Sequence, residues 1–207
     1  AALPSAGDGR GAAPLLRTGR AAWSVVKVGG SLVSDPERLR AVLSACLAQA
    51  PIAVVPGGGP FAEAVRTSQA ALGYDDRLAH RLALDAMGRM AEILCALEPR
   101  LTVAADVDAV ASVLGAGGCV VWDPAALKAG APDIAESWAV TSDSLALWLA
   151  TRLGAGRCIL EKAAPVPDAD PQALAAAGLV DAAFPRFAAA FPGAIVVRGP
   201  ERAERAA

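Results

Sequence analysis

One short pattern, an apolar strand that runs into glycines and is followed by a helix, occurs twice in succession and constrains this chain most. The first copy reads WSVVKV over residues 23–28, then Gly29 and Gly30, then apolar residues at helical spacing over residues 36–50. The second reads IAVVP over residues 52–56, then three glycines, then PFAEAVRTSQAAL. Strand, glycine turn and helix in this order are the units of a parallel sheet that helices cover.

The alternation continues through the rest of the chain. A long helix is expected over residues 76–97, ended by Pro99, and another over TSDSLALWLATRL, with Thr141 or Ser142 as its N-cap. The expected buried faces are Phe61, Val65 and Leu72 in the second helix, and Leu78, Leu82, Met90, Ile93 and Leu97 in the long one. Further strands are expected at residues 101–104, 119–122, 157–160 and 193–199, with a loop at KAAPVPDADP and short helices in PQALAAAG and DAAFPRFAAAF. We therefore predict a three-layer α/β/α sandwich with a mainly parallel central sheet.

Composition excludes several classes of function. The formal net charge of -2 lacks the positive footprint of a nucleic-acid binder. Apolar runs fall far short of the roughly 20 residues that cross a bilayer, so no membrane partner is expected. The 4 cysteines form no CxxC pair, which favours reduced thiols and a cytoplasmic protein. With 1 histidine, no resident metal site is expected.

The 207 residues suffice for one well-cored domain. The first 22 are rich in Ala, Gly, Arg and Pro without a sustained period, and we expect them to form a disordered extension. Residues 23–207 are expected to form the single domain.

Lys27 and the two glycine clusters are the first candidates for chemistry. Ligands of an open parallel sheet bind outside the carboxyl ends of its strands, where both clusters fall, and glycines followed by a helix N-terminus suit phosphate. Either cluster alone is also a tight turn, and Lys27 alone is also an edge-strand lysine. Neither loop contains the GxxxxGK[ST] of a Walker A motif. Gly57, Gly59 and Ala62 fit the G-x-G-x-x-A dinucleotide fingerprint, but the chain that follows reads as helix where that fingerprint requires a strand.

The stretches VVKVGGSL, VVPGGGPFAEAV, VTSDSLALWLA and RCILEK together resemble the amino acid kinase superfamily, over roughly residues 23–199. Its members transfer the γ-phosphoryl group of ATP to carboxylates, phosphates or phosphonates. VPGGGPFA, RLAHRLALDAM, TSDS and GLVDAAFP are most similar to the small aspartokinase-like kinases of methanofuran biosynthesis, which phosphorylate an aminomethylfuran methyl phosphate. The resemblance implies an acceptor-binding part over residues 23–135, a nucleotide-binding part over residues 136–200, Mg2+ entering with ATP, and a homodimer.

The resemblance also implies roles for three charged residues. Lys27 is expected to bridge the transferring phosphoryl group and its acceptor, and Asp143 to orient the catalytic lysines. Lys162 is expected to be a second catalytic and ATP-binding lysine. Without the family, Asp143 reads as a residue favoured in the first turn of a helix, and Lys162 as an exposed loop lysine.

The remaining expected site residues are ligand contacts. Gly29, Gly30 and Ser31 are expected to surround the ATP phosphates, and Gly57, Gly58 and Gly59 to hold the acceptor or the γ-phosphate. Arg77 and His80 are expected to contact the substrate, although both, like Arg81, also read as ordinary residues of a helix. His80 is not needed as a general base because a phosphate acceptor is already ionised near neutral pH.

One departure from the family lies at EKAAPVPDADP, where many members carry a T-D-V-D-G-like segment near the nucleotide. The sequence therefore leaves the adenine pocket unassigned. It also leaves two other functions open, a catalytically idle protein that binds nucleotide or anions, and a carbamate or acylamino-acid kinase.

Overall fold

The computed structural model describes residues 21–200 and contains a six-stranded sheet in which every pair of neighbouring strands is parallel. The strand order is β3-β4-β2-β1-β5-β6. The strands are β1 (Ala21–Val28), β2 (Ile52–Pro56), β3 (Leu101–Ala104), β4 (Cys119–Trp122), β5 (Ala155–Glu161) and β6 (Ala194–Arg198). The mainly parallel sheet predicted from the sequence is confirmed. Most of the predicted extension lies outside the described residues, and its last two residues, Ala21 and Ala22, begin β1.

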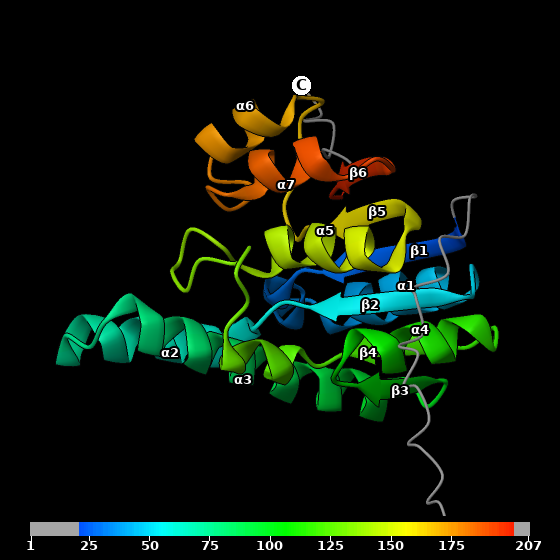
Figure 1. The fold of residues 1–207 in the computed structure, drawn as a ribbon, viewed down its shortest axis with the longest axis horizontal. Coiled ribbons are helices and arrows are strands. Elements are labelled where there is room, and N and C mark those ends of the chain that lie inside the picture. Colours follow the sequence, from blue (N-terminus) through cyan, green and yellow to red (C-terminus); the bar gives the residue numbers. More distant parts are fainter. Residues whose placement is uncertain (1–20, 201–207) are drawn as a thin grey trace, which may run out of the picture.

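Helices cover both faces of the sheet, which completes the predicted three layers (Figure 1). The longer helices are α1 (Pro36–Leu47), α2 (Gly59–Leu72), α3 (Asp76–Leu97), α4 (Val107–Gly115) and α5 (Ser142–Leu153). The shorter ones are η1 (Gly30–Ser34), η2 (Pro124–Ala129), α6 (Pro171–Ala176) and α7 (Phe184–Ala190). No helix within residues 21–200 combines the length and apolar character that a membrane crossing requires.

Alternation along β1 decides which side chains reach which face. Val26 and Val28 pack in the core formed with α1 and part of α3. Val25 packs in the other core, together with residues of α4 and α5. Lys27 follows Val25 by two residues and therefore points to the α5 side of the sheet.

The carboxyl end of β1 is the point at which the strand order diverges. β1 pairs with β2 on one side and with β5 on the other. Such a divergence opens a crevice beyond the strand ends, which is where ligands bind in open parallel sheets. α2 and the beginning of α3 extend past this edge of the sheet (Figure 1).

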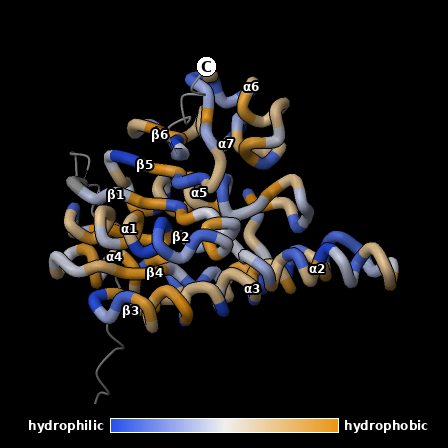
Figure 2. Tube along the Cα trace, turned by 180° about the vertical axis from the view of Figure 1, so that it is seen from behind, coloured by the Kyte–Doolittle hydropathy of each residue, from blue (hydrophilic) through white to orange (hydrophobic). Residues whose placement is uncertain are grey.

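The predicted buried face of α2 is wrong. Phe61 is 41% exposed and Leu72 is 78% exposed, and Ala62 is the residue of α2 that is buried. Because α2 extends beyond the sheet, no layer covers its apolar side. Figure 2 shows apolar residues concentrated in strands such as β1 and β4 but interspersed with polar ones along α2.

The predicted buried stripe of α3 is displaced around the helix. Leu78, Ile93 and Leu97 are exposed, whereas Leu84 and Met87 are buried. The neighbouring surface of α3 also carries the small residues Ala79, Gly88 and Ala91, which are buried. Small residues let the helix approach its neighbours closely: a Cβ atom at Gly88 would lie 2.8 Å from Oδ1 of Asp123.

Candidate active site

A cavity of about 650 Å3 lies where the carboxyl end of β1 meets the glycine loops and α5. Lys27 lines it, together with Gly30, Ser31 and residues 57–59. Thr141, Ser142 and Asp143, at the beginning of α5, line it as well. The fold thus brings together residues that are more than a hundred positions apart in the sequence.

Asp143 lies between two lysines in this region. Its Oδ1 is 2.9 Å from Nζ of Lys27, and its Oδ2 accepts a hydrogen bond of 2.6 Å from Nζ of Lys162. The side chains of Lys27, Asp143 and Lys162 are only 7%, 8% and 14% exposed. The Lys27 contact is an ion pair without hydrogen-bond geometry, so Oδ1 of Asp143 is buried without a hydrogen bond from any described residue.

This arrangement is two buried cations around one buried anion, and the pKa values reflect it. Burial by itself would raise the pKa of Asp143, but the charges of Lys27 and Lys162 outweigh that effect and lower it. Burial and the charge of Lys27 lower the pKa of Lys162 to about 8, although Asp143 opposes them. With all three groups ionised the cluster carries a net positive charge, which favours an anion in the adjoining cavity.

The two glycine loops touch each other through their backbones. A Cβ atom at Gly30 would lie 2.3 Å from the nitrogen of Gly59, and one at Gly57 would lie 2.4 Å from the nitrogen of Gly30. Gly59 also has a φ of +54°, in the left-handed region that favours glycine. Only residues without a side chain allow this close approach.

The contact between the loops places two helix beginnings beside Lys27. Gly29 and Gly58 are the N-cap residues of η1 and α2, and neither helix has a side-chain cap hydrogen bond. The first N–H groups of a helix have no partner within that helix. Such groups suit phosphate oxygens. The N–H groups of Gly29 and Gly57 already donate to the carbonyl oxygens of Glu161 and Val28, so the phosphate contacts expected within residues 29–31 and 57–59 stay a prediction.

His80 lines the cavity but Arg77 does not. His80 is buried and its Nδ1 lies 3.3 Å from the carbonyl oxygen of Ser137. Burial lowers the pKa of His80, against the effects of that carbonyl and of Glu136. Arg77 instead pairs with Glu136 at 2.6 Å, and Arg81 reaches the same carboxylate at 3.4 Å. The two arginines therefore hold the chain that leads into α5.

The cavity residues that were not anticipated from the sequence include Arg66, Glu63 and Trp138. The guanidinium of Arg66 lies 4.3 Å from the ring centroid of Trp138, and the indole N–H of Trp138 donates to Gln69 at 2.6 Å. Glu63 pairs with Arg66 at 3.5 Å, one helical turn away. Arg66 and Glu63 look like an ordinary solvated pair in the sequence, and the only signal at Trp138 is its position just ahead of the TSDS motif.

A second cavity, of about 430 Å3, lies in the C-terminal part of the chain. Its walls are the loop at residues 166–169, the helices α6 and α7 and the strand β6, with Leu174 and Phe184 at its apolar side. The loop belongs to the EKAAPVPDADP segment, which begins at the buried Glu161. The segment that departs from the family pattern therefore borders a cavity.

Comparison with known proteins agrees with this architecture. The amino acid kinase family model matches residues 22–103. A curated protein of Methanocaldococcus jannaschii, [5-(aminomethyl)furan-3-yl]methyl phosphate kinase, is 31% identical over 139 residues, which is 66% of this chain and 63% of that protein.

Solved structures with the same fold come from several kinases. A uridylate kinase of Archaeoglobus fulgidus has a TM-score of 0.65 at 19% identity and covers 86% of this chain and 90% of its own. A UMP kinase of Bacillus anthracis has a TM-score of 0.64 at 14% identity, with 86% and 87% coverage. An aspartate kinase of Synechocystis has a TM-score of 0.65 at 18% identity, covering 86% of this chain and 38% of its own.

The chain thus has the amino acid kinase fold, built around a lysine, aspartate and lysine cluster. The resemblance to the amino acid kinase family predicted from the sequence is confirmed, and so is its narrower similarity to the methanofuran-type kinase.

Proposed function

We propose that this protein is a kinase that transfers the γ-phosphoryl group of ATP to a small acceptor bearing a phosphate or a carboxylate. The observation that carries the proposal is the ion-paired arrangement of Lys27, Asp143 and Lys162 next to two backbone glycine loops. Phosphoryl transfer requires little covalent chemistry from the protein, because alignment and neutralisation of charge on the moving group do most of the work. Two fixed cations and a set of helix N–H groups provide both.

Each residue of the cluster has a defined task in this proposal. Lys27 lines the cavity and neutralises the group in transit. Asp143 holds both ammonium groups in place, since each of its oxygens faces one of them. No general base is needed for an ionised acceptor, and His80, whose pKa is lowered, serves as a neutral contact to the acceptor.

The residues present fit ATP phosphates but not a resident magnesium ion. Bound ATP would supply the phosphoryl group, and residues 29–31 with Lys162 would hold its phosphates. Across the described part of the chain, no three His, Cys, Asp or Glu side chains lie together as a metal site. Both oxygens of Asp143 already face lysines, so we derive no step from a protein-bound metal. Mg2+ is proposed to arrive with the nucleotide, held by phosphates and water.

We propose that the nucleotide base lies in the second cavity, which the loop after β5 lines from Val166 to Ala169. Leu174 and Phe184 offer the base an apolar wall, and the carboxylate of Asp168 can accept from an exocyclic amino group. The C-terminal part of the chain would then bind ATP, and the part that includes α2 and α3 would bind the acceptor.

For the acceptor we propose [5-(aminomethyl)furan-3-yl]methyl phosphate, the compound in the name of the curated relative. The chain aligns with less than two thirds of that relative, so the acceptor is argued from the cavity as well. Leu84, Met87 and Trp138 form apolar walls for a small ring, and the carboxylate of Glu63 suits an ammonium group. The phosphate would lie at the inner end, beside Lys27.

The test is turnover by the purified protein with ATP and Mg2+ on this phosphate, with carbamate, acetylglutamate and aspartate as competing acceptors. We expect the furan phosphate to be converted to its diphosphate, and Lys27→Ala to lower kcat by orders of magnitude while the protein stays folded. Preference for another acceptor would overturn the proposed substrate. Nucleotide binding by calorimetry without turnover on any acceptor would favour the idle binder instead.

A further inference from the structure

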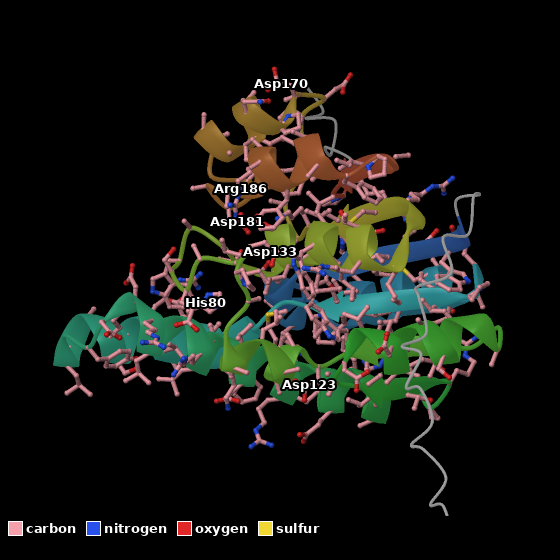
Figure 3. All side chains as sticks on the ribbon, in the orientation of Figure 1. His80, Asp123, Asp133, Asp170, Asp181 and Arg186 are labelled. Atoms are coloured by element: carbon pink, nitrogen blue, oxygen red, sulfur yellow. The ribbon has the colours of Figure 1, made fainter. Side chains whose placement is uncertain are left out.

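Asp181 is a partly buried acceptor for four donors from the beginning of α5. It lies in the segment between α6 and α7, and Figure 3 shows it close to α5, whereas Asp170 lies toward the far end of the α6 and α7 region. Its Oδ2 accepts from the backbone N–H of Thr141 at 2.9 Å, from the Thr141 hydroxyl at 2.8 Å and from the backbone N–H of Ser144 at 3.0 Å. Its Oδ1 accepts from the hydroxyl of Ser144.

These contacts replace the cap that α5 lacks. Thr141 is the N-cap residue, but its side chain makes no cap hydrogen bond, because the N–H of Ser144, which such a cap would bind, donates to Asp181. The early N–H groups of a helix need acceptors from outside the helical ladder. Asp181 supplies one from 37 residues beyond Ser144 and 40 beyond Thr141.

The capped turn is the one that carries Asp143. Thr141 and Ser144 flank that residue in the sequence, and both are fixed to the same carboxylate. A backbone hydrogen bond of 2.9 Å from the N–H of Ala183 to the carbonyl oxygen of Ala139 holds the approach to the helix as well. The local cap of α4 satisfies fewer donors, since the carboxylate of Asp106 accepts from the N–H of Ala109, three residues ahead.

We infer that Asp181 is a positioning residue that fixes the first turn of α5 so that Asp143 stands between Lys27 and Lys162. Its effect on turnover rests on the proposed kinase function, whereas its effect on geometry does not. The segment between α6 and α7, which forms no wall of the first cavity, is thereby tied to the reacting groups.

The experiment compares Asp181→Ala with Asp106→Ala, which removes the cap of α4, a helix that lines neither cavity. Both variants lose a helix cap and should melt at lowered temperatures, with the larger decrease in Asp181→Ala, where four donors lose their acceptor and not one. Only Asp181→Ala should lower kcat, by about 100-fold, the loss expected when a catalytic group moves by about 1 Å. KM for ATP and for the acceptor should change less than kcat, because the glycine loops and the walls from α2 and α3 are unchanged.

Two milder variants, Asp181→Asn and Thr141→Val, keep the test informative if the alanine variant does not fold. An asparagine oxygen still accepts from Thr141 and Ser144, and its amide can donate to the Ser144 hydroxyl, so Asp181→Asn should recover most of the lost kcat. Thr141→Val removes one of the four donors and should give a smaller loss than Asp181→Ala. Full activity of Asp181→Ala, or an equal loss in Asp106→Ala, would overturn the inference.

A second readout does not depend on turnover. Amide hydrogen exchange at Ser144 and the NMR signals of the Lys27 and Lys162 ammonium groups should change in Asp181→Ala and stay unchanged in Asp106→Ala. If the wild-type protein turns over no acceptor, the proposed function fails while this comparison still decides the role of Asp181. Unchanged exchange and lysine signals in Asp181→Ala would overturn that role.

Discussion

Asp143 is the residue on which both lysines of the site depend for their position and their charge. Its carboxylate is buried between two ammonium groups at 2.9 Å and 2.6 Å. A buried pair is costly to break from one side, because the remaining charge keeps its desolvation penalty and loses its partner. The same contacts that align the lysines therefore also bear on the stability of the fold.

Asp143→Asn should destabilise the protein by about 3–5 kcal/mol, the range for removing one partner of a buried ion pair. Two lysines would then face each other without a counter-charge. Urea unfolding of the single variant, of Lys162→Met and of the double variant measures this coupling. The double variant should be less destabilised than the sum of the two single ones, and strict additivity would contradict the ion-pair account.

The protonation of Lys162 should set an alkaline limit on activity. Its pKa is lowered to about 8 by burial and by Lys27, so the side chain is charged below that pH and loses its charge above it. If Lys162 neutralises phosphate oxygens, kcat/KM should fall as pH rises through about 8. In Lys162→Arg, which stays charged over this range, the remaining activity should lack that fall. An unchanged alkaline limb in this variant would assign it to another group.

At the scale of elements, the two glycine loops work only as a pair. Each loop ends a parallel strand and begins a helix, and the two backbones approach so closely that side chains are excluded. Gly30 in η1 and Gly59 in α2 therefore set the separation of two helix N-termini. A phosphate site built in this way depends on backbone position more than on any side chain.

Gly30→Ala should impair both folding and phosphate binding, because its Cβ would lie 2.3 Å from a backbone nitrogen. The matched control is Gly115→Ala at the end of α4, where a Cβ meets nothing within 4 Å and φ is not positive. That control should be neutral or stabilising by up to about 1 kcal/mol. Thermal unfolding and calorimetry with ATP compare the two. Wild-type ATP affinity in Gly30→Ala would contradict the proposed phosphate loops.

The sequence predicted the elements well because their signals are local. β-branched runs next to glycines became β1 and β2, and the long helix begins and ends at the predicted residues, Asp76 and Leu97. The predicted buried face of α2 was wrong, and that of α3 was confirmed only at Met90, because periodicity shows which residues share a face and not which face meets a partner. Phe61 and Leu72 are apolar residues on the exposed side of α2.

The site was predictable in part. Lys27, Asp143 and the glycine loops follow from strand ends and family motifs, and the structure brings them to one cavity. The packing of Arg66 on Trp138 could not be anticipated, because the two residues are far apart in the sequence and share no motif. Asp181 lies in the GLVDAAFP stretch and its donors in TSDS, but nothing in the sequence pairs the two stretches, because they are about forty residues apart.

At the scale of the whole molecule, the fold forms two cavities that the proposed reaction would use together. The first cavity lies among α2, α3 and the glycine loops, and the second lies among α6, α7 and β6. The expected boundary near residue 135 does not separate them cleanly, since Trp138 and residues 140–143 line the first cavity. Residues 136–143 therefore connect the proposed acceptor side to the helix that carries Asp143. The homodimer implied by the resemblance stays a prediction.

Amide hydrogen exchange, measured with each ligand alone, should show which ligand binds at which cavity. The acceptor phosphate without nucleotide should protect the beginning of α2 and residues 136–143, because both border the first cavity. A non-hydrolysable ATP analogue should instead protect residues 162–171, at the second cavity, and residues 29–31 at the glycine loops. Trp138→Phe keeps an aromatic wall but removes the N–H that donates to Gln69. This variant should reduce the protection of amides by the acceptor and leave the protection of amides by the ATP analogue unchanged. Protection by the acceptor alone at residues 162–171 would contradict this division, since it would place the acceptor where the base is proposed to lie.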